Sequence, residues 1–271
     1  MKWLDSPASD IQITHRQRLW LYILAVLIMI FLVIPTLIVI PMSFSASQYL
    51  EFPPREWSLR WYEFYFNSAS WMQATATSFK AAVLTMLVAT PLGVAAAYGL
   101  FVSRHKAGQF VFILLISPMM IPIILIAIGV FYVYVQIKLV NTIPGLVIAH
   151  TVHSLPLVLI IVSSALKSFD INLEMAARNL GASRFRAFMS VTLPQIKFAV
   201  VTAALLAFLS SFDEVIIAMF VSGGENSTLT RNMFNALRDQ IDPTIASIST
   251  IMVLVSSTLL IATQFLGKKR D

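Results

Sequence analysis

The sequence contains no cysteine, which excludes disulfides, thiolate metal ligands and cysteine nucleophiles. Charge is also scarce: charged residues make up 12% of the 271 residues, about half of the usual ~25% in soluble domains. The basic residues are scattered through short polar segments, so the net charge of +6 does not indicate a nucleic-acid partner. The sequence also lacks a G-x-x-x-x-G-K-[ST] phosphate loop, and we expect no metal site, catalytic residue or cofactor on this chain.

Apolar side chains are in excess, at 58% of all residues. A soluble domain of this length could not bury so many, so lipid must surround part of them. A bilayer core about 30 Å thick needs roughly 20 apolar residues of helix, because no backbone polar group stays unpaired in lipid. We therefore predict an all-α, polytopic membrane protein with six transmembrane helices. The six stretches are Leu19–Met42, Ala81–Val102, Phe110–Val135, Ile143–Leu166, Phe198–Val221 and Ile245–Leu266.

The orientation of these spans follows from the basic residues. Of the 19 lysines and arginines, 13 fall on the side of the N-terminus, so the positive-inside rule predicts that both termini are cytoplasmic. The first stretch has 24 residues, whereas the apolar part of a signal peptide has about 7–15, and we expect it to remain as an anchor. The external segment 43–80 holds an aromatic cluster typical of a membrane interface: Trp57, Trp61, Tyr62, Tyr65 and Trp71.

The longest inner segment, Lys167–Lys197, is too polar to span the membrane. Asp170 or Asn172 can cap a short helix that runs to about Leu180, and Gly181 supplies a break after it.

A second short helix is expected from Ser183, and Pro194 then precedes the fifth span. Its apolar residues Phe185, Phe188 and Val191 are spaced to form a ridge. The segment is therefore predicted to be a helical hairpin with an apolar strip that is exposed unless a partner covers it.

This hairpin carries a family motif. Residues 174–194, EMAARNLGASRFRAFMSVTLP, resemble the EAA loop of the type I ABC importer permeases. The family's glutamate position holds Met175, and Glu174 stands one residue earlier. The residues that match in type and spacing are Ala176, Ala177, Gly181, Val191, Leu193 and Pro194.

The resemblance implies a type I ABC importer transmembrane-domain fold, in which this cytoplasmic loop is a coupling helix seated in a groove of an ATPase subunit. The contact residues would be Glu174, Ala176, Ala177, Gly181, Phe185, Phe188, Leu193 and Pro194. The implied partners are two ATPase subunits that bind ATP and Mg, a second homologous permease, and an extracytoplasmic substrate-binding protein in the bacterial inner membrane.

The same resemblance divides the chain into three parts. Residues 1–72 would hold the N-terminal segment, the first span and an external loop, 73–266 the five-helix permease core with the coupling loop 167–197, and 267–271 a basic tail.

Only two acidic residues, Asp213 and Glu214, lie within a predicted span. An ionised side chain at the bilayer centre costs about 2.5–3.5 kcal/mol, so both should face another helix or a water-filled path. One hypothesis is that they attract a cationic solute, and the surrounding SSFDEV resembles the spermidine/putrescine branch of these permeases. The alternative is that one of the acids pairs with a neighbouring helix.

Several other functions remain open from the sequence. The solute could be another small amino-containing compound, such as an amino-acid derivative or an aminophosphonate, or the chain could be a self-sufficient secondary transporter. His150 and His153 share a helix face, which favours hydrogen bonding between helices over a metal site, because no third ligand is evident.

Overall fold

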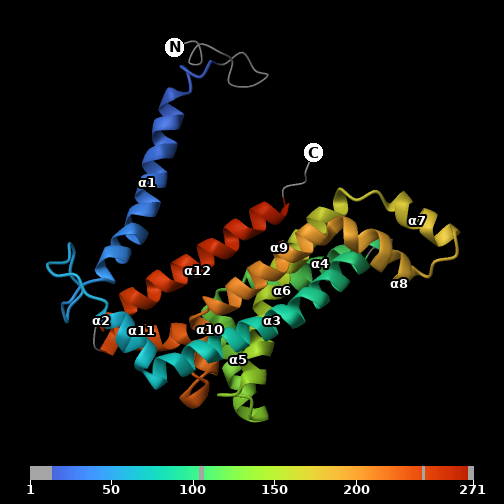
Figure 1. Ribbon diagram of the computed structural model, residues 1–271. Helices are drawn as coiled ribbons and strands as arrows, with labels where there is room; N and C mark the ends of the chain where they lie inside the picture. Colours follow the sequence, from blue (N-terminus) through green and yellow to red (C-terminus); the bar gives the residue numbers. More distant parts are fainter. Residues whose placement is uncertain (1–13, 104–106, 240–241, 268–271) are drawn as a thin grey trace. The chain divides into compact units, whose positions relative to one another are not determined.

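The computed structural model describes residues 14–103, 107–239 and 242–267, and these are almost entirely helical (Figure 1). Residues 1–13 and 268–271, which include most of the predicted basic tail, lie outside the described part. The described chain forms two compact units. One unit contains the residues up to Phe64 together with 241–253, and the other contains Tyr65–Gln240 and the residues from Leu254 onward.

The first unit begins with α1, Leu19–Met42, whose bounds are those predicted from its apolar run. None of its residues is buried within the chain, as expected for a helix solvated by lipid. The connection after α1 is held by two side chains from α2, Arg60–Asn67. The Tyr62 and Ser43 hydroxyls lie 2.7 Å apart, and the Trp61 indole N–H donates to the Ser47 carbonyl at 3.0 Å.

The predicted interfacial cluster of five aromatic residues is therefore only partly correct. Trp57 is 68% exposed, whereas Tyr65 and Trp71 are buried in the second unit. The Tyr65 hydroxyl lies 2.7 Å from that of Thr75 on the following helix. A buried tyrosine needs such a partner for its hydroxyl, and the sequence pattern gives no sign of it.

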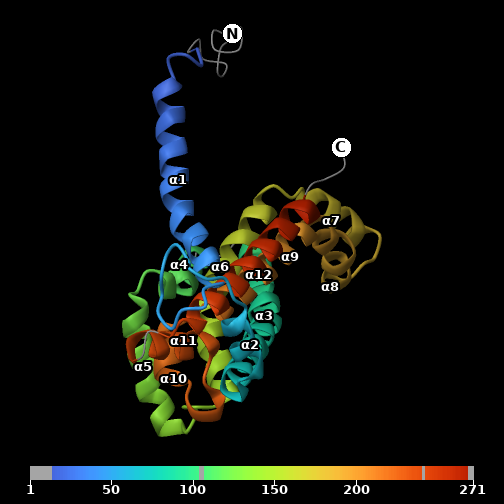
Figure 2. The same cartoon turned by 60° about the vertical axis from the view of Figure 1, so that its left-hand side comes forward.

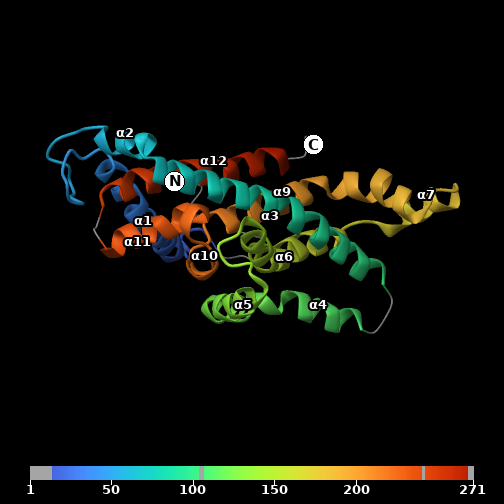
Figure 3. The same ribbon diagram turned by 90° about the horizontal axis from the view of Figure 1, so that it is seen from below.

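The centre of the second unit is the packing of α3, Ala69–Val102, against α6, Ile143–Lys167, and α9, Leu193–Phe212 (Figure 3). One side of α3 carries small buried residues every four positions: Ala81, Thr85, Ala89, Gly93 and Ala97. Small residues at this spacing let membrane helices approach closely. A Cβ atom added at Gly93 would lie 2.5 Å from Cγ1 of Val158, so α3 and α6 are in contact there.

The third predicted span is broken. Instead of one helix over Phe110–Val135, the chain forms α4, Gly108–Ile116, a 3₁₀ turn, Ser117–Met119, and α5, Ile123–Ile137. The two halves meet at 94° (Figure 3). Pro118 and Pro122 flank the bend, and neither can donate a helical hydrogen bond. Within the described residues, five helices are long and apolar enough to cross a membrane, or six if this bent pair counts as one span.

The fifth predicted span, Phe198–Val221, is also divided differently. The helix begins at Arg184 with α8, Arg184–Ala187, widens into a π turn over Phe188–Thr192, and continues as α9. The second short helix predicted from Ser183 is therefore not separate, because it continues through the π turn into the span. The π turn ends two residues before Pro194, whose nitrogen cannot donate an ordinary helical hydrogen bond.

At its other end this span stops at Phe212 and resumes as α10, Ile216–Val221. The break therefore falls on Asp213 and Glu214. The chain then continues through α11, Leu229–Asp239, and α12, Thr244–Gly267. Within the second unit, α7, Ile171–Asn179, and α8 lie at one end of α3 and α9, while α10 and α11 lie toward the other (Figure 1).

The close approach at Gly93 gives a first prediction. Gly93→Ala should destabilise the protein by about 1–3 kcal/mol, because the added methyl group overpacks against Val158. Gly99→Ala, on the same helix, adds a methyl group in open space and should leave stability unchanged or slightly raised. Thermal unfolding of the purified proteins measures both. Equal melting temperatures for the two alanine variants would contradict this packing.

Candidate functional site

The predicted hairpin at residues 167–197 is formed by local capping. The Asp170 carboxylate accepts a hydrogen bond from the Asn172 amide at 3.0 Å and starts α7, and the Ser183 hydroxyl accepts one from the Arg186 amide at 3.3 Å and starts α8. Between them, Gly181 has a φ of 91°, a backbone conformation that side chains rarely tolerate. The caps and the glycine break predicted from the sequence are confirmed. Figure 2 shows the hairpin projecting beyond the end of α9.

The predicted contact residues of this hairpin do not all face the same way. Phe185 is 74% exposed, and Ala176 and Pro194 are also exposed. Leu180, which was not among the predicted contact residues, is 90% exposed. Phe185 also lines an apolar groove of about 670 Å³ together with Phe188 and Leu193, and the other wall of this groove is α3 at Pro91 and Val94. The hairpin thus has an outer surface open to a partner and an inner surface turned toward α3.

Glu174 belongs to the inner set. Only 2% of its surface is exposed, and its two carboxylate oxygens have separate donors. The Tyr98 hydroxyl of α3 donates to Oε1 at 2.5 Å, and the Thr192 hydroxyl of the π turn donates to Oε2 at 2.5 Å. Both are charge-assisted hydrogen bonds, which are stronger than neutral ones. Glu174 is therefore unavailable to a partner protein in this structure, and neither donor could be identified from the sequence.

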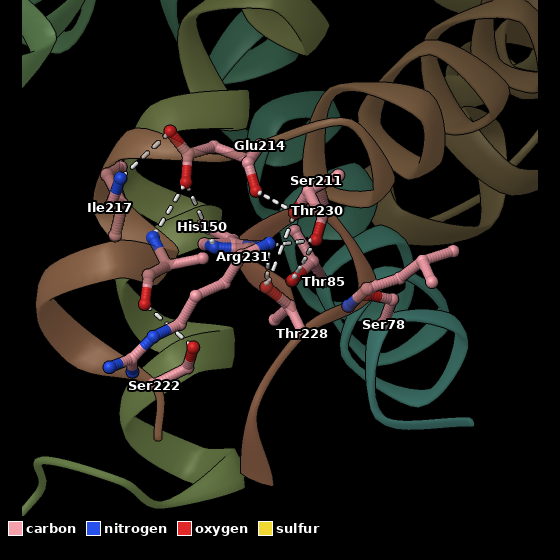
Figure 4. Close-up of polar contacts among 12 residues, drawn as sticks. Ser78, Thr85, His150, Ser211, Glu214, Ile217, Ser222, Thr228, Thr230 and Arg231 are labelled. Atoms are coloured by element: carbon pink, nitrogen blue, oxygen red, sulfur yellow. Dashed lines mark hydrogen bonds and ion pairs between the residues drawn. The ribbon is translucent and has the colours of Figure 1, made fainter. Parts of the chain in front are cut away.

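The two acids of the broken span occupy opposite environments. Asp213 is exposed on the chain, whereas Glu214 is 6% exposed. The Glu214 carboxylate accepts hydrogen bonds from the amides of Ile217 at 3.0 Å and Ala218 at 2.9 Å, which are the first turn of α10 (Figure 4). Glu214 therefore supplies the acceptors that the start of a helix lacks. The sequence left open which acid faces a pathway, and the structure leaves Asp213 free to do so.

A buried polar network surrounds this break (Figure 4). His150 of α6 lies with Nδ1 2.7 Å from the Ser211 hydroxyl and Nε2 3.7 Å from a Glu214 oxygen. The Ser211 hydroxyl also lies 3.4 Å from that of Thr85 on α3, and the Thr230 hydroxyl donates to the Glu214 carbonyl at 2.8 Å. The hydrogen bond between helices expected of the histidine pair is thus made by His150.

The loop that follows α10 is anchored to distant segments. The Gln73 side chain donates to the Glu225 carbonyl at 2.9 Å, and the Asn226 side chain donates to the Asn141 carbonyl at 2.8 Å. A polar cavity of about 250 Å³ lies between this loop and α3, and Arg231 forms part of its wall. Burial lowers the pKa of the Arg231 guanidinium from its usual value.

A helical bundle with several apolar spans and a projecting hairpin is the arrangement expected of a membrane transport permease. The chain belongs to the family of binding-protein-dependent transport system inner membrane components, whose model matches residues 89–270. It is therefore a multi-pass membrane protein and an ABC importer permease, a subunit of a transport system and not its catalytic part.

Two curated relatives cover most of the chain. The chain is 29% identical over 240 residues to the spermidine/putrescine transport system permease protein PotC of Escherichia coli (strain K12), covering 89% of this chain and 90% of that protein. It is 28% identical over 241 residues to the putrescine transport system permease protein PotI of the same strain, covering 86% of this chain and 85% of that protein.

A solved structure shares the fold. The crystal structure of a bacterial ABC transporter that imports the acidic polysaccharide alginate has a chain that matches with a TM-score of 0.68 and 17% identity. The match covers 96% of this chain and 99% of that one. Because one such transporter takes an acidic polysaccharide, the fold alone does not define the solute.

The opposite environments of the two acids give a second prediction. Glu214→Ala should lower stability by about 1–3 kcal/mol, because the amides of Ile217 and Ala218 lose their buried acceptor. Asp213→Ala removes an exposed carboxylate and should change stability by no more than about 0.5 kcal/mol. Thermal unfolding in detergent compares the two. A larger loss for Asp213→Ala than for Glu214→Ala would show that their roles are reversed.

Proposed function

We propose that this chain is a permease subunit of an ATP-driven importer of polyamines such as spermidine or putrescine. The observation that carries the proposal is the exposed carboxylate of Asp213 at the break between α9 and α10. Its neighbour Glu214 is satisfied by the α10 amides, so among the residues that the structure describes the Asp213 carboxylate is the acid of the fifth span that has no partner. The two relatives, a spermidine/putrescine permease and a putrescine permease, support the same class of solute.

Aromatic rings next to Asp213 favour an ammonium-bearing solute. Phe208 and Phe212 stack with their ring centroids 5.7 Å apart, and the exposed Phe79 of α3 meets Phe208 edge-on at 5.8 Å. A carboxylate and aromatic faces are the two groups that bind spaced ammonium ions well. Because Phe208 and Phe212 are buried and Phe79 is exposed, a solute with several ammonium groups could place one on Asp213 and another over the Phe79 ring.

The energy for transport would come from other polypeptides. We infer that ATP and Mg bind to two ATPase subunits, and that a second homologous permease and an extracytoplasmic binding protein complete the importer. The outer surface of the hairpin, with Leu180 and Phe185 exposed, suits a groove on an ATPase. Closure of the ATPases would then move the hairpin and switch the pathway between its two openings, with both termini of this chain in the cytoplasm.

The substrate proposal predicts that Asp213→Asn raises the KM for spermidine uptake roughly tenfold, since one charge-assisted contact is worth about 1.5–3 kcal/mol. Glu63→Gln, an exposed acid of α2, should leave uptake unchanged. Uptake of radiolabelled spermidine into cells that carry the partner subunits measures both, after the level of each variant in the membrane is matched. Normal uptake by the double variant that carries both Asp213→Asn and Glu214→Gln would exclude a cation role for the pair.

The coupling proposal is tested at Gly181, which has a positive φ and open space around it. Gly181→Ala strains the hairpin turn, so uptake per ATP hydrolysed should fall severalfold while insertion stays normal. Gly224 has the same backbone constraint, with a φ of 57° and open space, but lies outside the hairpin. Gly224→Ala is therefore the matched control and should remain coupled. If both variants transport alike, the hairpin is not the coupling element.

A further inference from the structure

The buried carboxylate of Glu174 connects segments that are far apart in the sequence. Tyr98 stands near the end of α3, and Thr192 closes the π turn that leads into α9. Each donates one hydrogen bond of 2.5 Å to Glu174 on α7. The Tyr98 ring also packs against Phe188 with the centroids 4.5 Å apart. One side chain thus holds the hairpin, α3 and α9 together at the same point.

The chemistry of this contact determines which movements of α7 are favourable. No lysine, arginine or histidine in the described part of the chain lies within 4 Å of the Glu174 carboxylate. Its buried charge depends on the two hydroxyl donors, and a buried carboxylate without donors is unfavourable. A movement of α7 relative to α3 would break the Tyr98 hydrogen bond and leave one oxygen of the buried carboxylate without its donor. The favoured movement is therefore one in which α7 and α3 shift together.

We propose that Glu174 is a positioning residue that makes the hairpin and α3 move as one unit, so that α3 transmits the movement to the break at Asp213. Thr85 lies 13 residues before Tyr98 on the same unbroken helix, a distance of about 20 Å at 1.5 Å per residue. There its hydroxyl meets that of Ser211, two residues before Asp213. The inference rests on the proposed coupling function and names the connection that it requires.

This role differs from docking. Residues that meet a partner must be accessible, as Leu180 and Phe185 are, whereas Glu174 is almost fully covered. Replacing Glu174 should therefore leave attachment of the ATPases intact and affect what their movement does.

The absence of cysteine allows a direct test. Spin labels on Leu173→Cys, at an exposed position of α7, and Gly99→Cys, at a position of α3 with open space, report the distance between the two elements. In the assembled importer this distance should stay the same in the nucleotide-free and ATP-bound states. With Tyr98→Phe added, which keeps the ring against Phe188 but removes the donor, the distance should differ between the two states. A distance that changes in the unmodified background would overturn the proposal.

The functional readout is the number of spermidine molecules taken up per ATP hydrolysed. Tyr98→Phe combined with Thr192→Val should lower this ratio about tenfold, with ATPase subunits still copurifying. Glu174→Gln keeps an oxygen acceptor and should retain more of the ratio than Glu174→Ala. Tyr132→Phe and Thr258→Val, at exposed positions, are the matched controls and should behave as wild type.

The outcomes separate this inference from the function on which it rests. Wild-type protein without ATP-driven uptake would overturn both. ATP-driven uptake in wild type, with an unchanged ratio in the Tyr98→Phe, Thr192→Val variant, would overturn the Glu174 connection and leave the importer intact.

Discussion

The close approach of α3 to α6 and α9 is the constraint on which the second unit depends. Small residues every four positions bring the helices together, and at Gly93 there is no room even for a methyl group. In lipid, apolar surface alone does not favour one helix neighbour over another, because lipid tails are equally apolar. The steric fit of the small residues therefore fixes the position of α3. Two polar contacts far apart depend on that position: Tyr98 with Glu174, and Thr85 with Ser211.

The two buried glutamates, Glu214 and Glu174, obtain hydrogen-bond donors for their carboxylates in different ways. Glu214 takes its donors from the backbone at the start of α10, so it supports a helix within its own segment. Glu174 takes its donors from two side chains on other elements, so it connects segments. In both cases the donors offset the desolvation of the carboxylate. Asp213, which has no such donors in the described part of the chain, is the acid that stays accessible.

The sequence predicted some elements well and others poorly. The bounds of α1 and the caps of α7 and α8 follow from local composition and from side chains two or three residues away. The breaks within the third and fifth spans were missed, because both lie inside stretches whose average composition is apolar. Hydropathy indicates whether a segment lies in lipid or in water, but it does not reveal a bend within that segment. The proline pair at the first break and the acidic pair at the second are visible in the sequence, but prolines also occur inside α1, α3 and α6, which stay continuous.

The amino-acid sequence by itself determined that the chain is a helical membrane protein with a capped hairpin carrying a permease motif. Those properties depend on composition, on apolar run length and on hydrogen bonds between residues close in sequence. Only the tertiary structure decided that Glu174 faces inward, that Glu214 is buried and that Asp213 is exposed. Their environments are set by hydroxyls 76 and 18 residues away from Glu174, and by the helix that starts after the break. Such long-range donors leave no periodic signal in a single sequence, because the sequence does not distinguish a buried hydroxyl from an exposed one.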